Sequence, residues 1–202
     1  YRYFYIYFKT FSMPTIETLF LLVLSILAME SAYSIRSLYR HFLTGITQKS
    51  LNAFYYACSY AKADCFRFMN VTAAMALKII PQNLTSQPVF LCIDDTMAAK
   101  FGEKFEDVSK LFDHAAHNGA NYMNGHCFVS VMLCVPVWNK NRIHYLSVPL
   151  GYRMWQKKES KLDLAASMVR QVMPEFKTMK NVILLCDSWY VKKNLVSIVD
   201  EY

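Results

Sequence analysis

The sequence lacks the marks of several protein classes. It has no repeats, no low-complexity stretch and no apolar run of the roughly 20 residues that a membrane-spanning helix needs. The apolar segment at residues 19–29 is shorter than that and is bracketed by Glu17 and Glu30, so we predict a buried helix there. Since 54% of the residues are hydrophobic and 15% are aromatic, the chain is not too polar to form a core. We therefore expect a folded protein that does not span a membrane.

Recognisable cysteine and serine sites are missing as well. The six cysteines form no CxxC pair and no cluster with the spacing of zinc ligands, and four of them lie in apolar runs. We interpret them as reduced thiols of a cytoplasmic protein, where cysteines commonly act as small buried hydrophobes. No G-x-S-x-G element occurs, which argues against a hydrolase with a serine nucleophile.

The histidines do not form a recognisable metal site. His114 and His117 have His-x-x-His spacing, and His126 follows at a distance, but the carboxylate or cysteine partner of a zinc-protease site is lacking. We expect loop hydrogen bonding or DNA contact for His114 and His117. For His126, which begins an apolar run, we expect a structural role.

The net charge is moderately positive. With 22 basic and 15 acidic residues, the formal net charge is +7. Such an excess fits a nucleic-acid partner, but it also fits many ordinary basic proteins. Basic side chains in the N-terminal region could bind DNA, but the region has no secure helix-turn-helix signature. The alternative is a helical domain that serves only packing. These side chains are Arg36, Arg40, His41, Lys49, Lys62 and Arg67.

Composition changes near residue 88 and divides the chain into regions. Apolar residues recur at helical spacing before it, and short apolar runs bounded by polar turns follow it. Residues between the two are rich in Pro, Asn, Gln and Ser, which is typical of a linker. We therefore predict an unassigned tail at 1–12, a helical region at 13–80, a linker at 81–88 and an α/β region at 89–202.

The α/β region has an order of elements that favours a mixed sheet flanked by helices. Two β-prone runs separated by a polar turn at residues 138–141 predict a hairpin. An amphipathic helix and a further apolar strand follow the hairpin. The predicted elements are a strand at 89–93, a helical or turn segment at 106–112, strands at 126–137 and 142–148, a helix at 160–173, a strand at 182–186 and a helix from about 191.

Two of the predicted strands end in acidic residues. Asp94 and Asp95 follow the apolar run at 89–93, and Asp187 follows the run at 182–186. Carboxyl ends of neighbouring strands are where α/β sheets build their sites, and two carboxylates placed together there favour a cation between them. Mg²⁺ prefers such oxygen ligands, and a pair of ions roughly 4 Å apart supports phosphodiester chemistry. The alternative for each acid alone is the cap of a following helix.

The α/β region of the sequence resembles a known family. The segments IDDTMAAKFG, KLFDHAAHNGANYMNGHCFVSVMLCV, VPLGYRMW and LLCDSWY, in this order, are similar to the DDE domain of bacterial insertion-sequence transposases of the IS-four type. The resemblance covers roughly residues 88–195. It implies a ribonuclease H-like fold and a DNA transposase that cleaves and joins strands with two Mg²⁺ or Mn²⁺ ions. It further implies a homodimer acting on paired transposon ends at the bacterial nucleoid.

The resemblance assigns catalytic and metal-binding roles to Asp95 and Asp187. Asp94 stays open as the alternative to Asp95, because adjacent residues of a strand point to opposite faces of the sheet. The family's third acid, a Glu on a later helix, has no match, because Asp200 and Glu201 follow Asp187 too soon. We therefore expect an incomplete catalytic domain, and the alternative is a non-catalytic, DNA-binding remnant of a transposase.

Several further residues are candidates for DNA contact beside this site. Lys100 follows the first acidic strand, and a basic, aromatic cluster follows the hairpin. Lys and Arg can bind phosphates and Trp can stack on bases, whereas the alternative is a solvated loop with one anchoring tryptophan. The full set of predicted DNA contacts is Lys100, His114, His117, Arg153, Trp155, Lys157 and Lys158. We expect Trp189 and Tyr190 to pack a helix start, and Gly125 to permit a tight turn.

Overall fold

The computed structural model describes residues 2–9, 11–31, 34–61, 64–101, 105–112 and 122–201. The chain forms two compact units, Tyr1–Asp64 and Cys65–Tyr202, which are described separately here. Their boundary differs from the predicted division at the 81–88 linker. The last helix of the predicted 13–80 region belongs to the second unit, because its buried residues Met69, Ala73 and Ala76 are part of the core of the sheet.

The first unit is helical, as predicted. A small core of Leu38, Leu43 and Phe54 holds it together. The side chain of Ser34 caps its third helix by accepting a hydrogen bond from the backbone N–H of Ser37 at 3.1 Å. Its elements are α1 (Arg2–Phe8), α2 (Met13–Ala28), α3 (Ile35–His41), the 3₁₀ turn Leu43–Gly45 and α4 (Leu51–Tyr60). Helix α1 lies in the segment to which the sequence assigned no structure.

Helix α2 corrects the prediction of a buried helix at residues 19–29. Most of its residues are apolar, and α1, α3 and α4 contact it within the unit, but it is not buried along its whole length. Ile16 is 3% exposed, whereas Leu27 is 76% exposed. Among the described residues, no helix is both long enough and apolar enough to cross a membrane.

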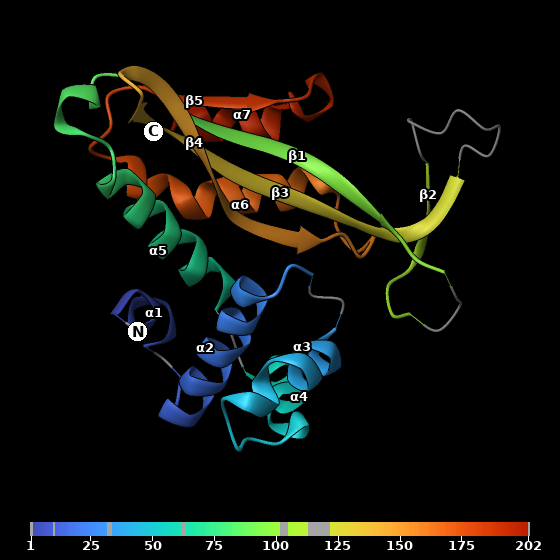
Figure 1. Ribbon diagram of the computed structural model, residues 1–202. Helices are drawn as coiled ribbons and strands as arrows, with labels where there is room; N and C mark the ends of the chain where they lie inside the picture. The colour runs from blue at the N-terminus through green and yellow to red at the C-terminus, as the bar shows by residue number, and fades with distance from the viewer. Residues whose placement is uncertain are drawn as a thin grey trace. The chain divides into compact units, whose positions relative to one another are not determined.

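The second unit is built on a five-stranded mixed sheet (Figure 1). The strand order is β2-β3-β1-β5, and β4 pairs with β3 as well. Strand β1 pairs antiparallel with β3 and parallel with β5. The elements are α5 (Cys65–Lys78), β1 (Val89–Ala99), β2 (Ser109–Phe112), β3 (Tyr122–Asn139), β4 (Arg142–Met154), α6 (Lys161–Val172), β5 (Val182–Cys186) and α7 (Lys193–Asp200), with 3₁₀ turns at Gln82–Leu84, Met173–Phe176 and Ser188–Tyr190.

The core lies on the face of the sheet that α5 and α6 cover. Alternate residues of β1 and β3, such as Leu91 and Leu133, point toward α6 and are fully buried. Leu164 and Met168 of α6 complete this contact. In β5, the alternate side chains that point to the other face of the sheet are exposed, as the 46% exposure of Leu185 shows. The expected α/β class with a mixed sheet and flanking helices is confirmed.

Several predicted elements match the structure closely. Strand β5 has the predicted bounds, and α6 begins one residue after its Ser160 cap. The hairpin of β3 and β4 turns at Lys140 and Asn141, which both have positive φ (47° and 61°) as a tight hairpin turn requires.

Two predictions about strands were wrong. Strand β1 does not end at residue 93 but continues through both acids to Ala99, because β3 pairs with it from Phe90 as far as the Ala99–Gly125 pair. The segment predicted as helix or turn at 106–112 contains strand β2, because Ser109–Phe112 pairs with the start of β3. Both corrections arise from pairing between segments that are distant in sequence.

Gly125 serves close strand packing and not the predicted turn. It lies inside β3, opposite Ala99 of β1 and Ser109 of β2. A Cβ at this position would lie 2.5 Å from the carbonyl oxygen of Ala98, which is far inside van der Waals contact. Glycine is therefore required where the backbones of β1 and β3 approach each other.

Candidate functional site

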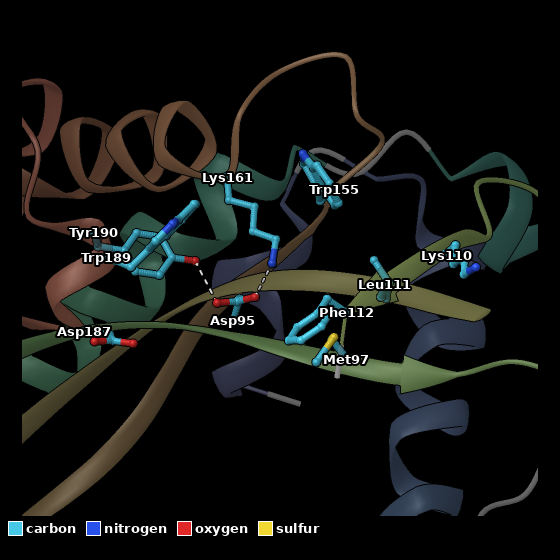
Figure 2. A pocket seen from close by; sticks show the side chains of 10 residues that line it. All are labelled: Asp95, Met97, Lys110, Leu111, Phe112, Trp155, Lys161, Asp187, Trp189 and Tyr190. Atoms are coloured by element: carbon cyan, nitrogen blue, oxygen red, sulfur yellow. Dashed lines mark hydrogen bonds and ion pairs between the residues drawn. The ribbon is translucent and has the colours of Figure 1, made fainter. Parts of the chain in front are cut away.

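A pocket of about 570 Å³ lies beside the region where β5 ends and β1 continues (Figure 2). Its walls combine two carboxylates, two ammonium groups and several aromatic rings. The lining residues are Asp95, Met97, Lys110, Leu111, Phe112, Trp155, Lys161, Asp187, Trp189 and Tyr190. Both acids that the sequence singled out are among them.

Strand geometry explains why Asp95 and Asp187 line one pocket. The parallel pairing of β1 with β5 ends at the Ile93–Cys186 pair. Asp187 comes directly after that pair on the β5 side, and Asp95 lies two residues beyond it on β1. Because strand residues alternate between faces, Asp95 points to the same side as buried Ile93, toward α6.

Asp94 points the other way and does not line the pocket. Its side chain is exposed, and its carboxylate accepts a hydrogen bond from the backbone N–H of Asp95 at 2.8 Å. Of the two adjacent acids, Asp95 and not Asp94 lines the pocket together with Asp187.

Three side chains from three different elements hold the Asp95 carboxylate. The Lys161 ammonium, from α6, donates to Oδ2 at 2.5 Å. The Tyr190 hydroxyl donates to Oδ1 at 3.3 Å, and the Cys127 thiol of β3 donates to Oδ2 at 3.3 Å. The lysine and tyrosine contacts are drawn in Figure 2. Asp95 is thus fixed in orientation and charge-paired within the protein.

The surroundings of Asp95 favour its ionised form. Burial acts to raise the pKa of the carboxyl group, but the hydrogen bond and positive charge of Lys161 outweigh it, and the pKa is lowered. Burial likewise acts to lower the pKa of Lys161, yet its contacts with Asp95 and Cys127 raise it. Burial and the charge of Asp95 raise the pKa of Tyr190, so this phenol stays a neutral donor. At neutral pH, Asp95 is therefore a carboxylate and faces the ammonium of Lys161.

Aromatic rings surround the Lys161 ammonium. Its Nζ lies 5.4 Å from the ring centroid of Trp155 and 5.9 Å from that of Trp189, within the range of cation–π attraction. Trp155 is itself held in place, because its indole N–H donates to the carbonyl oxygen of Glu159 at 2.8 Å. Lys161 is positioned by the start of α6, where Ser160 caps the helix.

The predicted DNA-contact residues after the hairpin have distinct surroundings. Trp155 lines the pocket, and Lys157 and Lys158 are exposed on the loop that follows it. The Lys157 ammonium lies 5.9 Å from the ring of Trp155. Arg153 is engaged inside the protein, where its guanidinium donates to Ser167 and forms a 3.2 Å ion pair with Glu159.

Other predicted contacts lie away from the pocket lining. The ammonium of Lys100 is 5.6 Å from the Phe105 ring. The Nε2 of His126 donates to the carbonyl oxygen of Glu106 at 2.8 Å, which agrees with the structural role expected for it. His114 and His117 lie outside the described residues.

The described basic residues of the predicted N-terminal region are divided between the two units. Arg36, Arg40 and His41 lie on α3, and Lys49 forms a 3.4 Å ion pair with Glu17 in the same unit. Arg67 belongs to α5 and hence to the second unit, and Lys62 lies outside the described residues.

Sequence reasoning missed the role of Lys161 and undervalued Tyr190. In the sequence, Lys161 is an ordinary helix-start residue, and its separation of 66 positions from Asp95 conceals their contact. Tyr190 was expected to pack a helix start, and it is indeed buried at 1% exposure, but its hydroxyl also reaches Asp95. Only the pairing of β1 with β5 and the packing of α6 on the sheet bring these groups together.

The pocket offers two carboxylates as ligands for the predicted divalent ions. Within the part of the chain that the structure describes, no group of three or more His, Cys, Asp or Glu side chains is placed to hold a metal. The nearby carboxylate of Asp163 is used in capping, since it interacts with Ser160 and Asn194. Asp95 and Asp187 remain, and two carboxylates fit the way Mg²⁺ binds with one or two protein ligands and several waters.

No known protein family, curated protein or solved structure matches the chain. The function is therefore inferred from the chemistry of the pocket and the arrangement of the strands around it.

Proposed function

We propose that the protein is a DNA transposase of the DDE type, with a ribonuclease H-like second unit. The observation that carries the proposal is that Asp95 and Asp187, from neighbouring parallel strands, line the same pocket. The order β4-β3-β1-β5, with only β5 parallel to β1, supports the ribonuclease H-like assignment.

In this proposal the two carboxylates hold divalent ions in the pocket. Bound Mg²⁺ or Mn²⁺ would supply an activated attacking oxygen and charge stabilisation for the leaving oxygen. Tyr190 and Cys127 keep the Asp95 carboxylate oriented toward the pocket. The reaction is attack of water on a phosphodiester at the transposon end, followed by attack of the freed 3′-hydroxyl on target DNA.

DNA is the proposed partner, and the loop after β4 is its proposed contact. Trp155 faces the pocket, while Lys157 and Lys158 extend from the same loop into solvent. Cationic side chains beside an aromatic ring suit a nucleic-acid strand, whose phosphates and bases they can engage together. We propose further that the protein acts as a homodimer on paired ends, in the cytoplasm at the nucleoid.

The decisive experiment is a nicking assay on insertion-end DNA in Mg²⁺ or Mn²⁺. We expect Asp95→Asn and Asp187→Asn each to lower cleavage by at least about 10³-fold if the wild-type chain cuts, because each removes a carboxylate from the metal site. Asp94→Asn is the matched variant, since it changes the adjacent acid outside the pocket. Retained metal-dependent cleavage in both Asp95→Asn and Asp187→Asn would overturn the proposal.

A non-catalytic DNA-binding protein is the second candidate. Two observations favour it. Among the described residues, no three His, Cys, Asp or Glu side chains are placed to hold a metal, and the Lys161 ammonium is already paired with Asp95. This candidate predicts DNA affinity that falls steeply with salt and no cleavage in either metal. Metal-dependent cleavage that Asp95→Asn abolishes would exclude it.

A further inference from the structure

The Asp95 carboxylate, which Lys161 contacts, lines the pocket where the proposed function needs a divalent ion. Lys161 Nζ donates to Oδ2, whereas Tyr190 donates to Oδ1 on the other side of the carboxylate. Both oxygens therefore have partners in the protein itself. A metal ion that binds Asp95 in the pocket therefore shares the carboxylate with these contacts.

Charge decides which of the contacts has to change. Tyr190 is a neutral donor, and its hydroxyl can stay on Oδ1 while an ion binds elsewhere on the carboxylate. Lys161 carries a full positive charge at hydrogen-bond distance from Oδ2. A divalent cation and an ammonium on one carboxylate repel each other strongly in a partly buried site, so the two compete.

Lys161 can leave without unfolding its surroundings. Its side chain is a flexible stem attached at the first turn of α6, and the helix is fixed independently by the Ser160 cap and by buried Leu164 and Met168. The carboxylate keeps two neutral donors, Tyr190 and Cys127, after the ammonium has moved. The rings of Trp155 and Trp189 lie 5.4 Å and 5.9 Å from the ammonium and line the same pocket.

We propose that Lys161 is a displaceable internal cation, which neutralises Asp95 in the metal-free protein and is expelled from Oδ2 when a divalent ion binds. The expelled ammonium stays in the pocket, where it binds a phosphate oxygen of the DNA strand. This inference rests on the proposed function and adds to it a competition between a side chain and the metal.

The test is Mn²⁺ binding alone, followed by the electron paramagnetic resonance signal of free Mn²⁺, on the whole chain. We expect Lys161→Met to bind Mn²⁺ on the order of tenfold more tightly than the wild type, because the competing charge is gone. Lys161→Arg keeps a cation and should stay close to the wild type. Lys157→Met is the matched control, because it removes an ammonium from the same Trp155 ring without touching Asp95.

Tryptophan fluorescence gives a second readout of the displacement. Of the three tryptophans, Trp138 is away from the pocket and donates to Asn83, so the variant Trp138→Phe leaves Trp155 and Trp189 as reporters. Adding Mn²⁺ or Mg²⁺ should change the emission of these two tryptophans in the Trp138→Phe variant. The change should be much smaller when Lys161→Met is added to that variant. Mg²⁺, which does not quench by paramagnetism, separates displacement from simple quenching.

The outcomes distinguish this inference from the proposed function. Mn²⁺ binding that Asp95→Asn abolishes and Lys161→Met strengthens supports both. Binding through Asp95 that Lys161→Met leaves equal or weaker overturns the displaceable cation while the metal site stands. Absence of Asp95-dependent binding in both the wild type and Lys161→Met overturns the metal site and, with it, the inference.

Discussion

At the scale of the residue, the contact between Asp95 and Lys161 makes stability depend on pH at both ends of the range. The lowered pKa of Asp95 gives stability that is present above the ordinary value of 3.8 and is lost as pH falls through the folded value. The raised pKa of Lys161 gives stability that is present below the ordinary value of 10.5 and is lost as pH rises through the folded value. The window of full stabilisation therefore runs from above pH 3.8 to below pH 10.5.

We predict that Lys161→Met lowers the free energy of unfolding by on the order of 1 kcal/mol at pH 7, because the pair is partly solvent-screened. Urea unfolding of both proteins should show this difference shrinking toward pH 3 and toward pH 11. A difference that stays constant across the range would mean that lost packing of the lysine stem, and not its charge, causes the destabilisation.

Gly125 supplies a second prediction at this scale. We expect Gly125→Ala to destabilise the protein by about 1–3 kcal/mol, because the new Cβ would press on the Ala98 carbonyl and force β1 and β3 apart. Gly45→Ala is the control, since a Cβ there has nothing within 4 Å. Equal unfolding midpoints in urea for the two variants would contradict the role given to Gly125.

At the scale of the element, the start of α6 links helix capping to the site. The Ser160 side chain caps the helix by accepting a hydrogen bond from the Asp163 N–H at 3.1 Å. Lys161 directly follows Ser160 in the chain. We predict that Ser160→Ala costs about 1 kcal/mol of stability and shifts the apparent Mn²⁺ affinity, because the base of the Lys161 side chain moves. Ser160→Asp keeps a capping acceptor and should restore both measurements. Unchanged stability in Ser160→Ala would mean that the cap is unimportant.

Elements were predictable from the sequence where their signals are local. An apolar run located β5, and an amphipathic pattern located α6. The continuation of β1 and the existence of β2 were not predictable, because both depend on pairing with β3. The meeting of Asp95 with Asp187 could be foreseen from two strand ends, whereas the Lys161 contact depends on how α6 packs on the sheet.

At the scale of the whole molecule, each of the two units has its own buried core. Phe54 is fully buried in the first and Leu133 in the second. All three tryptophans belong to the second unit, so their fluorescence reports on that unit, whereas far-ultraviolet circular dichroism reports on both.

We predict that Phe54→Ala lowers the stability of the first unit by about 3–5 kcal/mol and leaves the fluorescence transition in place, because the cavity forms in a separate core. Leu133→Ala should instead move the fluorescence transition by about 2–5 kcal/mol. Coincident shifts of both signals in Phe54→Ala would show that the units unfold together.

The two acids of the pocket differ in how the backbone supports them. Asp95 lies inside β1, where β3 continues to pair on one side after β5 has ended, whereas Asp187 follows the last residue of β5 and precedes a 3₁₀ turn. Asp95 is therefore the fixed member of the pair and Asp187 the adjustable one. Any change in the separation of the two carboxylates between steps of a reaction would be accommodated by the few residues after β5, without breaking a single ladder hydrogen bond of β1.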